Sequence, residues 1–500
     1  MNTMAAASLS AALPVARAAE KKDDRPNILL LFSEDISPNL SCYGTPVVQT
    51  PVLDKMAADG IRFTNAFVTG PVCSASRSAI ATGMCQTSIG AHNHRASKKQ
   101  PLPEPVKTFM QQLKEAGYYA TIQSKTDFNF LWDRKAALSG AGDWHGRAEG
   151  QPFFCQVNFG VTHRGFRRDP ERPIDPKTVA LPPVYPDHPI VRRDWADYLE
   201  SIQVMDRQAG AVLKRLDDEG IAGNTLVIFL GDHGQCLPRG KQFCYDDGLR
   251  VPLLVRWPKG VKAGQVRDEL VSSIDITATI LECAGVGTPA WMQGRPFLPE
   301  DKTLRQFIFA ARDRCDGTVD RIRCVRSKDF MYIKNFYPDR PYTQLNAYKE
   351  RQYPGLAVMK LLYKQGKLTP GQAQFMAATR PAEELYDVKA DPYELHNLAG
   401  DPKYAGAMKE FRDQLDNWIE TTGDKGSTPE DPGEIRRLHE KMVKQHEDFL
   451  KKIGVKESDL EGMVAYWEKR MEKVPTYSPE KDEGGLTKKA RDKKKKKEKK

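Results

Sequence analysis

The chain has 500 residues, of which 40% are hydrophobic and 28% charged, as in ordinary globular proteins. This length allows a large core and two domains, and no apolar run reaches the roughly 18 residues that would span a bilayer. The net charge of +10 is uneven: residues 481–500 hold 11 Lys and Arg against 4 Asp and Glu, a net +7 that leaves +3 for the rest. Bulk charge therefore gives no support to nucleic-acid binding.

The two ends of the chain differ from its middle. The first 22 residues are Ala-rich and contain Ala16-Arg17-Ala18, an A-x-A pattern typical of the end of an export signal, although the basic start of such a signal is missing. We expect residues 1–24 to be a leader whose start lies upstream, and the protein to be exported by a bacterium to the periplasm or the medium. Residues 476–500 predict a disordered Lys-rich tail, with attraction of a polyanion or the cell surface as the alternative.

The nine cysteines show no repeated CxxC spacing, which argues against a zinc site of the paired-cysteine type. In an exported protein some of them can form disulfides, but their spacing assigns no partners. They stand at positions 42, 73, 85, 155, 236, 244, 283, 315 and 324.

Along the first 300 residues, short apolar runs alternate with helical patterns. Continuous apolar runs are typical of strands buried on both faces of a sheet. They predict strands at 27–32, 118–123, 153–158 and 225–230. Helices are predicted at 51–60, 106–116 and 194–219. The alternation predicts an α/β fold with a large, mostly parallel central sheet flanked by helices.

The pattern changes after about residue 300. Short strands are predicted at 307–311, 321–326 and 330–335, which indicates a smaller antiparallel sheet, and residues 429–473 have the period of a charged helical hairpin. We therefore expect a large N-terminal domain at 25–303, a C-terminal subdomain at 304–425 and a helical extension at 426–475.

Polar residues follow the predicted strands at their carboxyl ends. They are Glu34 and Asp35, Lys125, His163, and Asp232 and His233. The carboxyl ends of parallel strands meet at one edge of a sheet, where α/β proteins bind their ligands. Two acids at one strand end and an Asp-His pair at another favour Ca²⁺ or Mg²⁺ over zinc. Taken singly, the Asp-His pair is often incidental, and Glu34-Asp35 also suits a turn or a helix start.

The stretch CSASRSAIATG, residues 73–83, lies where a loop becomes a helix. If residues 76–82 are helical, the free N–H groups and the dipole of the helix favour an anion near Cys73. We expect Arg77 in the first turn, where it adds a positive charge and a fork of donors. Together with a divalent cation, this describes a pocket for sulfate or phosphate. Taken alone, a cysteine such as Cys73 is more often a buried core thiol.

Four segments carry a resemblance to a known family. They are CSASRSAIATG, RPNILLLFSEDISPNLSCYG, LGDHG with GKQFCYDDGLRVP, and PAEELYDVKADPYELHNLAGDP. In order and spacing they resemble the formylglycine-dependent sulfatases of the alkaline-phosphatase superfamily, over residues 25–404. The resemblance implies an alkaline-phosphatase-like fold and makes residues 25–303 the catalytic domain.

The resemblance also implies a chemistry for Cys73. In this family the cysteine is oxidised to formylglycine, an aldehyde that hydrates to a geminal diol. One hydroxyl attacks sulfur and the organic alcohol or amine leaves; the second hydroxyl is deprotonated, sulfate is expelled and the aldehyde returns. A serine cannot eliminate sulfate in this way. The implied cofactor is Ca²⁺, with Mg²⁺ as the alternative, and the implied stabilisation of the sulfuryl oxygens is electrostatic.

Site roles are carried over position by position. The implied metal ligands are Glu34, Asp35, Asp232, His233 and the modified Cys73. Arg77 would support the aldehyde hydrate and the metal carboxylates, Lys241 would contact the sulfate, and His163 would protonate the leaving group. Lys125 falls on the lysine of the family motif Gly-Lys-x-His and is a further candidate catalytic residue. Two positions depart from the family pattern: Glu34 stands for Asp, and Asp127 for the histidine of Gly-Lys-x-His. Family members also use Asn where His233 stands, and His is an accepted variant there.

Two functions other than sulfate hydrolysis were weighed against the same residues. A phosphate or phosphonate ester hydrolase of the superfamily would normally use Ser or Thr as nucleophile, and an inactive glycan-binding relative would have lost these groups.

The segments ARDRCDGTVDRIRCVRSKDFMYIKNF and YELHNL are similar to bacterial relatives of heparan N-sulfatase. We therefore expect a sulfated carbohydrate as substrate, with an O-sulfate or glucosamine N-sulfate, a maturation enzyme as partner, and a homodimer as candidate assembly.

Overall fold

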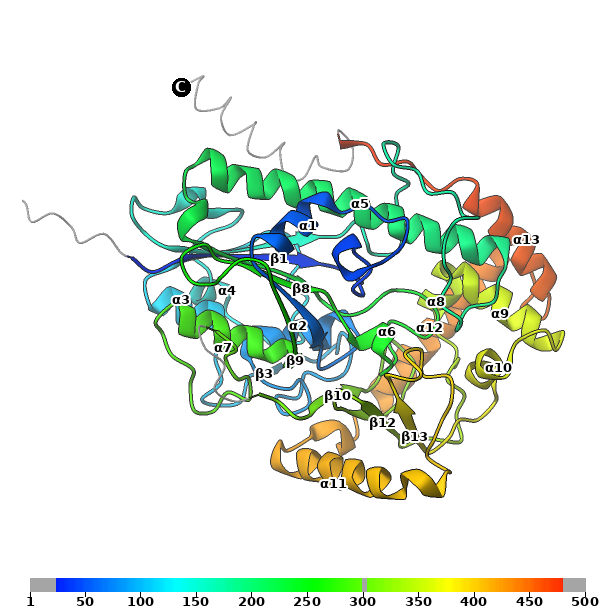
Figure 1. Ribbon diagram of the computed structural model, residues 1–500. Helices are drawn as coiled ribbons and strands as arrows, with labels where there is room; N and C mark the ends of the chain where they lie inside the picture. The colour runs from blue at the N-terminus through cyan, green and yellow to red at the C-terminus, as the bar shows by residue number, and fades with distance from the viewer. Residues whose placement is uncertain (1–23, 299–303, 480–500) are drawn as a thin grey trace, which may run out of the picture.

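A seven-stranded sheet forms the centre of the structure, a computed structural model that describes residues 24–298 and 304–479 (Figure 1). The strand order is β4-β6-β1-β7-β8-β2-β9. The strands are β1 (Asn27–Ser33), β2 (Ile61–Phe67), β4 (Tyr119–Ile122), β6 (Phe153–Phe159), β7 (Thr225–Gly231), β8 (Leu253–Arg256) and β9 (Gln265–Ser272). Only β8 is antiparallel to its neighbours within this sheet. The predicted fold class is confirmed.

Helices cover both faces of this sheet. In Figure 1, α1 and α5 lie above it, and α2, α3 and α7 lie below it. Their bounds are α1 (Pro51–Ala58), α2 (Cys73–Thr82), α3 (Phe109–Glu115), α5 (Pro189–Asp218) and α7 (Ser273–Cys283). Because both faces are covered, every residue of β7 is buried, which explains the continuous apolar run from which this strand was predicted.

Two helices begin at other residues than predicted. α5 begins at Pro189 rather than at residue 194, because His188 caps its first turn and proline fits the first helical position. α3 begins at Phe109 rather than at residue 106, because the side chain of Thr108 accepts a hydrogen bond from the first turn. Capping residues set both boundaries, and the hydrophobic period alone does not locate them.

A second sheet of four antiparallel strands follows, as predicted. Its strands are β10 (Ile308–Arg312), β11 (Ile322–Arg326), β12 (Phe330–Asn335) and β13 (Glu383–Asp387). Helix α11 (Ala405–Thr421) covers it, at the bottom of Figure 1. The Trp418 ring of this helix stacks on Phe309 with centroids 5.3 Å apart. The prediction contained three of these strands and lacked β13.

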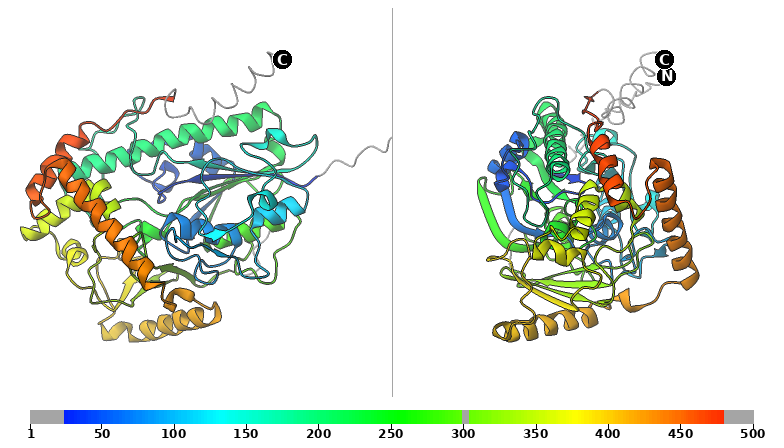
Figure 2. Two further views of the ribbon diagram at one scale, coloured as in Figure 1. Left: turned by 180° about the vertical axis from the view of Figure 1, so that it is seen from behind. Right: turned by 90° about the vertical axis from the view of Figure 1, so that its right-hand side faces the viewer.

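The two helices predicted within 429–473 are present as α12 (Pro432–Ile453) and α13 (Leu460–Met471), and Figure 2 shows both at one end of the molecule. They do not form the predicted hairpin, because α12 packs on α8 (Ala347–Gln352) rather than along α13. α13 packs on α5 and on α9. The remaining α-helices and strands among the described residues are α4 (Arg134–Ala137), α6 (Asp246–Leu249), α9 (Pro354–Lys364), α10 (Pro370–Met376) and the short strands β3 (Gln100–Pro101) and β5 (Phe130–Leu131).

A buried ion pair joins the second sheet to the segment after α11. Arg323 of β11 is fully buried, and its Nη2 lies 2.9 Å from Asp424 Oδ1 and 3.1 Å from Asp313 Oδ1. We expect Asp424→Asn to destabilise the protein by about 3 kcal/mol, because it leaves a buried guanidinium without its main counter-charge. Urea unfolding checks this, with Lys409→Ala in the exposed Lys409–Asp413 pair as control, expected to change stability by less than about 1 kcal/mol.

An Asp424→Asn midpoint no lower than that of the Lys409→Ala control would contradict the importance of the buried pair.

Some predictions concern residues or boundaries that the structure does not test. The leader and most of the Lys-rich tail lie outside the described residues, and the domain boundaries at 303 and 425 stay predictions. All nine cysteines lie within the described ranges and are free thiols there. Among the described helices, none combines the length and the apolar character needed to cross a bilayer.

Candidate active site

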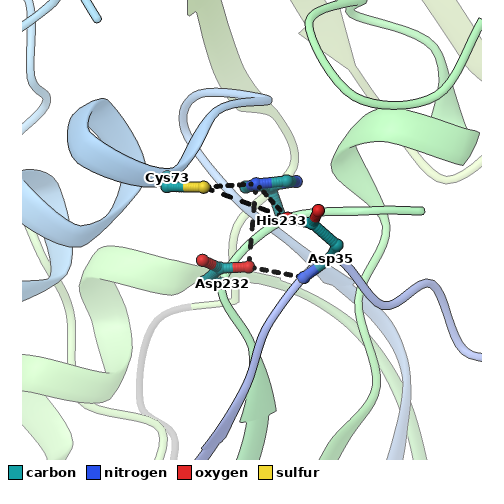
Figure 3. A group of neighbouring side chains, drawn as sticks. All are labelled: Asp35, Cys73, Asp232 and His233. Atoms are coloured by element: carbon teal, nitrogen blue, oxygen red, sulfur yellow. Dashed lines mark hydrogen bonds and ion pairs between the residues drawn. The ribbon is translucent and has the colours of Figure 1, made fainter. Parts of the chain in front are cut away.

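Neighbouring parallel strands bring the predicted site residues to one edge of the central sheet. Ser33 at the end of β1 pairs in register with Gly231 of β7 on one side and with Phe159 of β6 on the other. Glu34 and Asp35 follow β1, Asp232 and His233 follow β7, and His163 follows β6. Cys73 is the first residue of α2, and Figure 3 shows its side chain pointing toward the two strand ends.

The backbone around these ends is specialised. Asp35 adopts a left-handed conformation with φ of 50°, which aspartate tolerates better than most residues, and its N–H donates to Asp232 Oδ1 at 2.8 Å. Gly234 follows His233 at a close approach: a Cβ there would lie 2.0 Å from the carbonyl oxygen of Asp247. The sequence Asp-His-Gly thus places an acid and an imidazole where no third side chain fits.

Four buried side chains form a tight group: Asp35, Cys73, Asp232 and His233, whose potential ligand atoms all lie within 4.8 Å of one another (Figure 3). His233 Nε2 lies 2.9 Å from Asp35 Oδ1 and 3.2 Å from Cys73 Sγ. Besides Cys73, four side chains were predicted as metal ligands, and three of them lie together here: Asp35, Asp232 and His233. Glu34 lies outside this group, and its role as a ligand stays a prediction.

Cationic side chains surround the group. Lys241 Nζ donates to both carboxylate oxygens of Asp35, at 2.9 and 3.0 Å, and lies 3.4 Å from Cys73 Sγ. Lys125 Nζ donates to Glu34 Oε2 at 2.7 Å. His163 is farther away, with Nε2 3.7 Å from Asp35 Oδ2. All three basic residues predicted from strand ends or motifs therefore face the acidic pair Glu34-Asp35.

Arg77 differs from its prediction in one respect. Because α2 begins at Cys73, Arg77 lies in the second turn of the helix rather than the first. Its Nε donates to Asp232 Oδ2 at 3.0 Å and its Nη1 to Asn158 Oδ1 at 2.7 Å, while the guanidinium lies over the Phe32 ring. The buried guanidinium thus fixes the Asp232 carboxylate.

These charges change the titration of the group. Burial raises the pKa of Asp35, but Lys241, His163 and His233 outweigh it and hold that pKa well below its usual range. Burial likewise raises the pKa of the Cys73 thiol, and Lys241 and Lys125 bring it below the ordinary value. Burial lowers the pKa of His233, whereas Asp232, Cys73 and Asp35 raise it to about 10. The site therefore stabilises negative charge at Asp35 and at Cys73.

The donor set fits a hard cation only in part while Cys73 is a thiol. Two carboxylates and one imidazole suit Ca²⁺ or Mg²⁺, whereas sulfur suits softer metals. Conversion of Cys73 to an aldehyde hydrate would replace the sulfur by oxygen. The group would then consist of oxygen donors and one imidazole, which fits the predicted cation.

Several contacts were not predicted. Asn158 is the last residue but one of β6 and accepts a hydrogen bond from Arg77, and its place near a strand end was a usable signal. Tyr348 lies with its ring 5.4 Å from Lys241 Nζ and 6.1 Å from the His163 ring. No sequence pattern identifies Tyr348, because it lies far from the site in the chain.

Comparison with known proteins gives matches over most of the chain. The family model described as "Sulfatase" matches residues 26–144 and 133–286, and one described as "N-sulphoglucosamine sulphohydrolase, C-terminal" matches residues 231–349. An "Ulvan-active sulfatase" of Formosa agariphila is 35% identical over 82% of this chain and 77% of its own length. The human "N-sulphoglucosamine sulphohydrolase" is 28% identical over 80% of this chain and 90% of its own.

Solved structures show the same fold. One, in complex with its substrate D-glucosamine-2-N,6-O-disulfate, has a TM-score of 0.60 at 18% identity and covers 81% of this chain and all of its own. A phosphonate monoester hydrolase of Agrobacterium radiobacter has a TM-score of 0.61 at 17% identity, over 80% of this chain and 96% of its own. The fold alone therefore does not separate sulfatase from phosphonate hydrolase. The family match and the 35% identical relative do: the chain belongs to the sulfatase family, whose members hydrolyse sulfate esters.

Proposed function

We propose that this protein releases sulfate from a sulfated carbohydrate, and that its nucleophile is the hydrated aldehyde made from Cys73. The observation that carries the proposal is the position of Cys73: it is buried at the start of α2, within 3.4 Å of Lys241 Nζ and 3.2 Å of His233 Nε2. The named substrates of its relatives, ulvan and N-sulphoglucosamine, support a carbohydrate.

The surrounding residues have distinct roles in this proposal. Lys241 and Lys125 meet the sulfuryl oxygens and stabilise the charge that develops on them. Arg77 keeps the Asp232 carboxylate in place through the 3.0 Å hydrogen bond. His163, whose side chain is 30% exposed, faces the open side of the site and gives a proton to the leaving oxygen or nitrogen.

Asp35, Asp232 and His233 would hold the divalent cation, with Glu34 as a further candidate ligand. When bound, Ca²⁺ or Mg²⁺ would polarise the sulfuryl oxygens as a Lewis acid.

Maturation must precede folding in this proposal. Cys73 is 1% exposed and every residue of α2 is buried, so an enzyme that oxidises the thiol needs the unfolded chain.

We also propose export to the periplasm or the medium, from the leader pattern of residues 1–24. A homodimer stays a prediction.

The test of the function is sulfate release by protein produced together with a formylglycine-generating enzyme. The substrates are O-sulfated and N-sulfated glucosamine, sulfated ulvan oligosaccharides, an aryl sulfate and a phosphonate monoester. We expect sulfate from at least one sulfated sugar. Turnover of the aryl sulfate or the phosphonate alone would contradict a carbohydrate substrate. The match of residues 231–349 to the N-sulphoglucosamine sulphohydrolase C-terminal model favours the N-sulfate as first candidate.

Removal of divalent cations is expected to abolish sulfate release. The Asp35 and Asp232 carboxylates lie together in a fully buried site, so a cation is needed to polarise the substrate there. Dialysis against EDTA, followed by addition of Ca²⁺ or Mg²⁺ and a sulfate assay, checks this. Full activity after removal, with no metal found by elemental analysis, would contradict it.

A further inference from the structure

Arg95 lies beside the site in a fixed segment of backbone. Its N–H donates to the Oγ of Ser74, the residue after Cys73, at 3.0 Å. The next N–H, that of Ala96, donates to Asn129 Oδ1 at 2.8 Å. The position of Arg95 is therefore set relative to the first turn of α2.

The Arg95 side chain is held on one side and open on the other. Its Nε and Nη2 donate to the two oxygens of Asp127, at 3.2 and 2.9 Å, in a bidentate pair. A guanidinium has five N–H donors, and this pair uses two of them. No other hydrogen bond of this side chain occurs within residues 24–298 and 304–479, and the side chain is 53% exposed. Donors therefore remain for a ligand.

Asp127 connects this guanidinium to the sulfate-binding lysine. Lys125 Nζ lies 3.9 Å from Asp127 Oδ2 and donates to Glu34 at 2.7 Å. Asp127 stands where the sulfatase motif has a histidine, so this departure from the motif brings Arg95 into the charge network of the site.

The backbone on both sides of this pair is strained. Arg95, Ser124 and Asp127 have φ values of 51°, 62° and 53°, in the left-handed region that residues other than glycine rarely adopt. Strain of this kind persists where the surrounding structure enforces it, and it is concentrated at binding sites. The pair is thus built into the protein and differs from an incidental surface ion pair.

We propose that Arg95, oriented by Asp127, is a specificity residue that binds a second anionic group of the sugar. The inference rests on the proposed function and names its substrate class: a sulfated sugar that carries a further sulfate or a carboxylate near the sulfate that is cleaved. A guanidinium fork matches the paired oxygens of both groups. The cleaved sulfate has Lys125 and Lys241, which leaves Arg95 for the second anion.

Kinetics with four sugars tests the proposal. The probes are glucosamine N-sulfate, glucosamine 6-sulfate, glucosamine N,6-O-disulfate and an N-sulfated glucosamine linked to a uronate. We expect Arg95→Gln to raise KM about tenfold for the sugars with two anions, with kcat nearly unchanged and with little change for the monosulfates. Arg95→Lys should lie between, because it keeps the charge and loses the fork. The disulfate and the uronate separate the two sources of the anion.

The matched control is Arg412→Gln, in the bidentate Arg412–Glu383 pair at a similar exposure of 45%. It should leave every KM unchanged. Equal effects of Arg95→Gln on all sugars, or no effect on any, would overturn the proposal.

The positioning role of Asp127 and the proposed function are tested separately. Asp127→Asn should change the KM ratio of disulfate to monosulfate in the presence of Arg95 and leave it unchanged in the Arg95→Gln background. Calorimetric binding of the disulfate to a Cys73→Ala variant needs no turnover. If the protein were not a sulfatase, Arg95-dependent binding would persist without sulfate release. If affinity for the disulfate is the same with and without Arg95, the inference is wrong.

Discussion

Replacing Cys73 with serine is expected to lower multiple-turnover sulfate release by roughly 10⁴-fold or more. A serine hydroxyl can attack sulfur, but it lacks the second hydroxyl that expels sulfate from the hydrated aldehyde. The position is otherwise preserved, because Cys73 is 1% exposed at the start of α2 and serine differs only in the chalcogen atom. Steady-state release of sulfate from the preferred sugar measures the effect.

A matched control is Cys85→Ser. Cys85 is also a buried thiol, 4% exposed, but it lies outside the group formed by Asp35, Asp232 and His233. We expect this variant to keep its activity, with a modest loss of thermal stability. If Cys73→Ser kept wild-type turnover, the aldehyde mechanism would be wrong, and an ordinary thiol or hydroxyl nucleophile would have to replace it.

The second large effect is expected at Lys241. Lys241→Met removes a buried ammonium that lies 2.9 Å from Asp35 and 3.4 Å from Cys73, while it keeps most of the side-chain volume. Loss of one fixed positive charge at the developing oxyanion lowers kcat by about 10²- to 10³-fold in comparable sites. We expect a loss of that size, measured as kcat at saturating sugar, with the thermal unfolding midpoint recorded in parallel.

Lys349→Met is the control for removing a buried lysine. Lys349 lies in α8, 7% exposed, with Nζ 4.0 Å from the centre of the Phe243 ring. Burial, together with the charge of Arg312, holds the pKa of Lys349 well below its usual range. Replacing it with an apolar side chain should leave activity within a few-fold and stability unchanged or higher. Equal losses in the two variants would mean that Lys241 acts through the fold and has no direct role in catalysis.

The sheet could be predicted because its strands are covered on both faces. β1 and β7 are apolar along nearly their whole length. They lack the alternation of apolar and polar residues that a strand with one solvent-facing side shows. β13 was missed because it is acidic: Glu384 is fully buried, and its carboxylate accepts hydrogen bonds from Tyr245, Tyr342 and Tyr386. Only the tertiary contacts explain a buried glutamate in a strand.

The candidate site was accessible to prediction for a related reason. Parallel strands end at the same edge, so Asp35 and Asp232 had to lie close once β1 and β7 were adjacent. The Arg95–Asp127 pair depends on how the segment after α2 crosses the end of β4, and nothing in the local sequence encodes that crossing. The contact between Glu34 and Lys125 was likewise not predictable from the local sequence, because the two residues lie 91 positions apart in the chain.

The most direct test of the aldehyde mechanism is the mass of the proteolytic peptide that contains Cys73, from protein produced with a formylglycine-generating enzyme. The aldehyde mechanism predicts a species that has lost one sulfur and two hydrogens and gained one oxygen, and that reacts with an aldehyde-trapping reagent. An unmodified thiol at Cys73 in protein that still releases sulfate would contradict it.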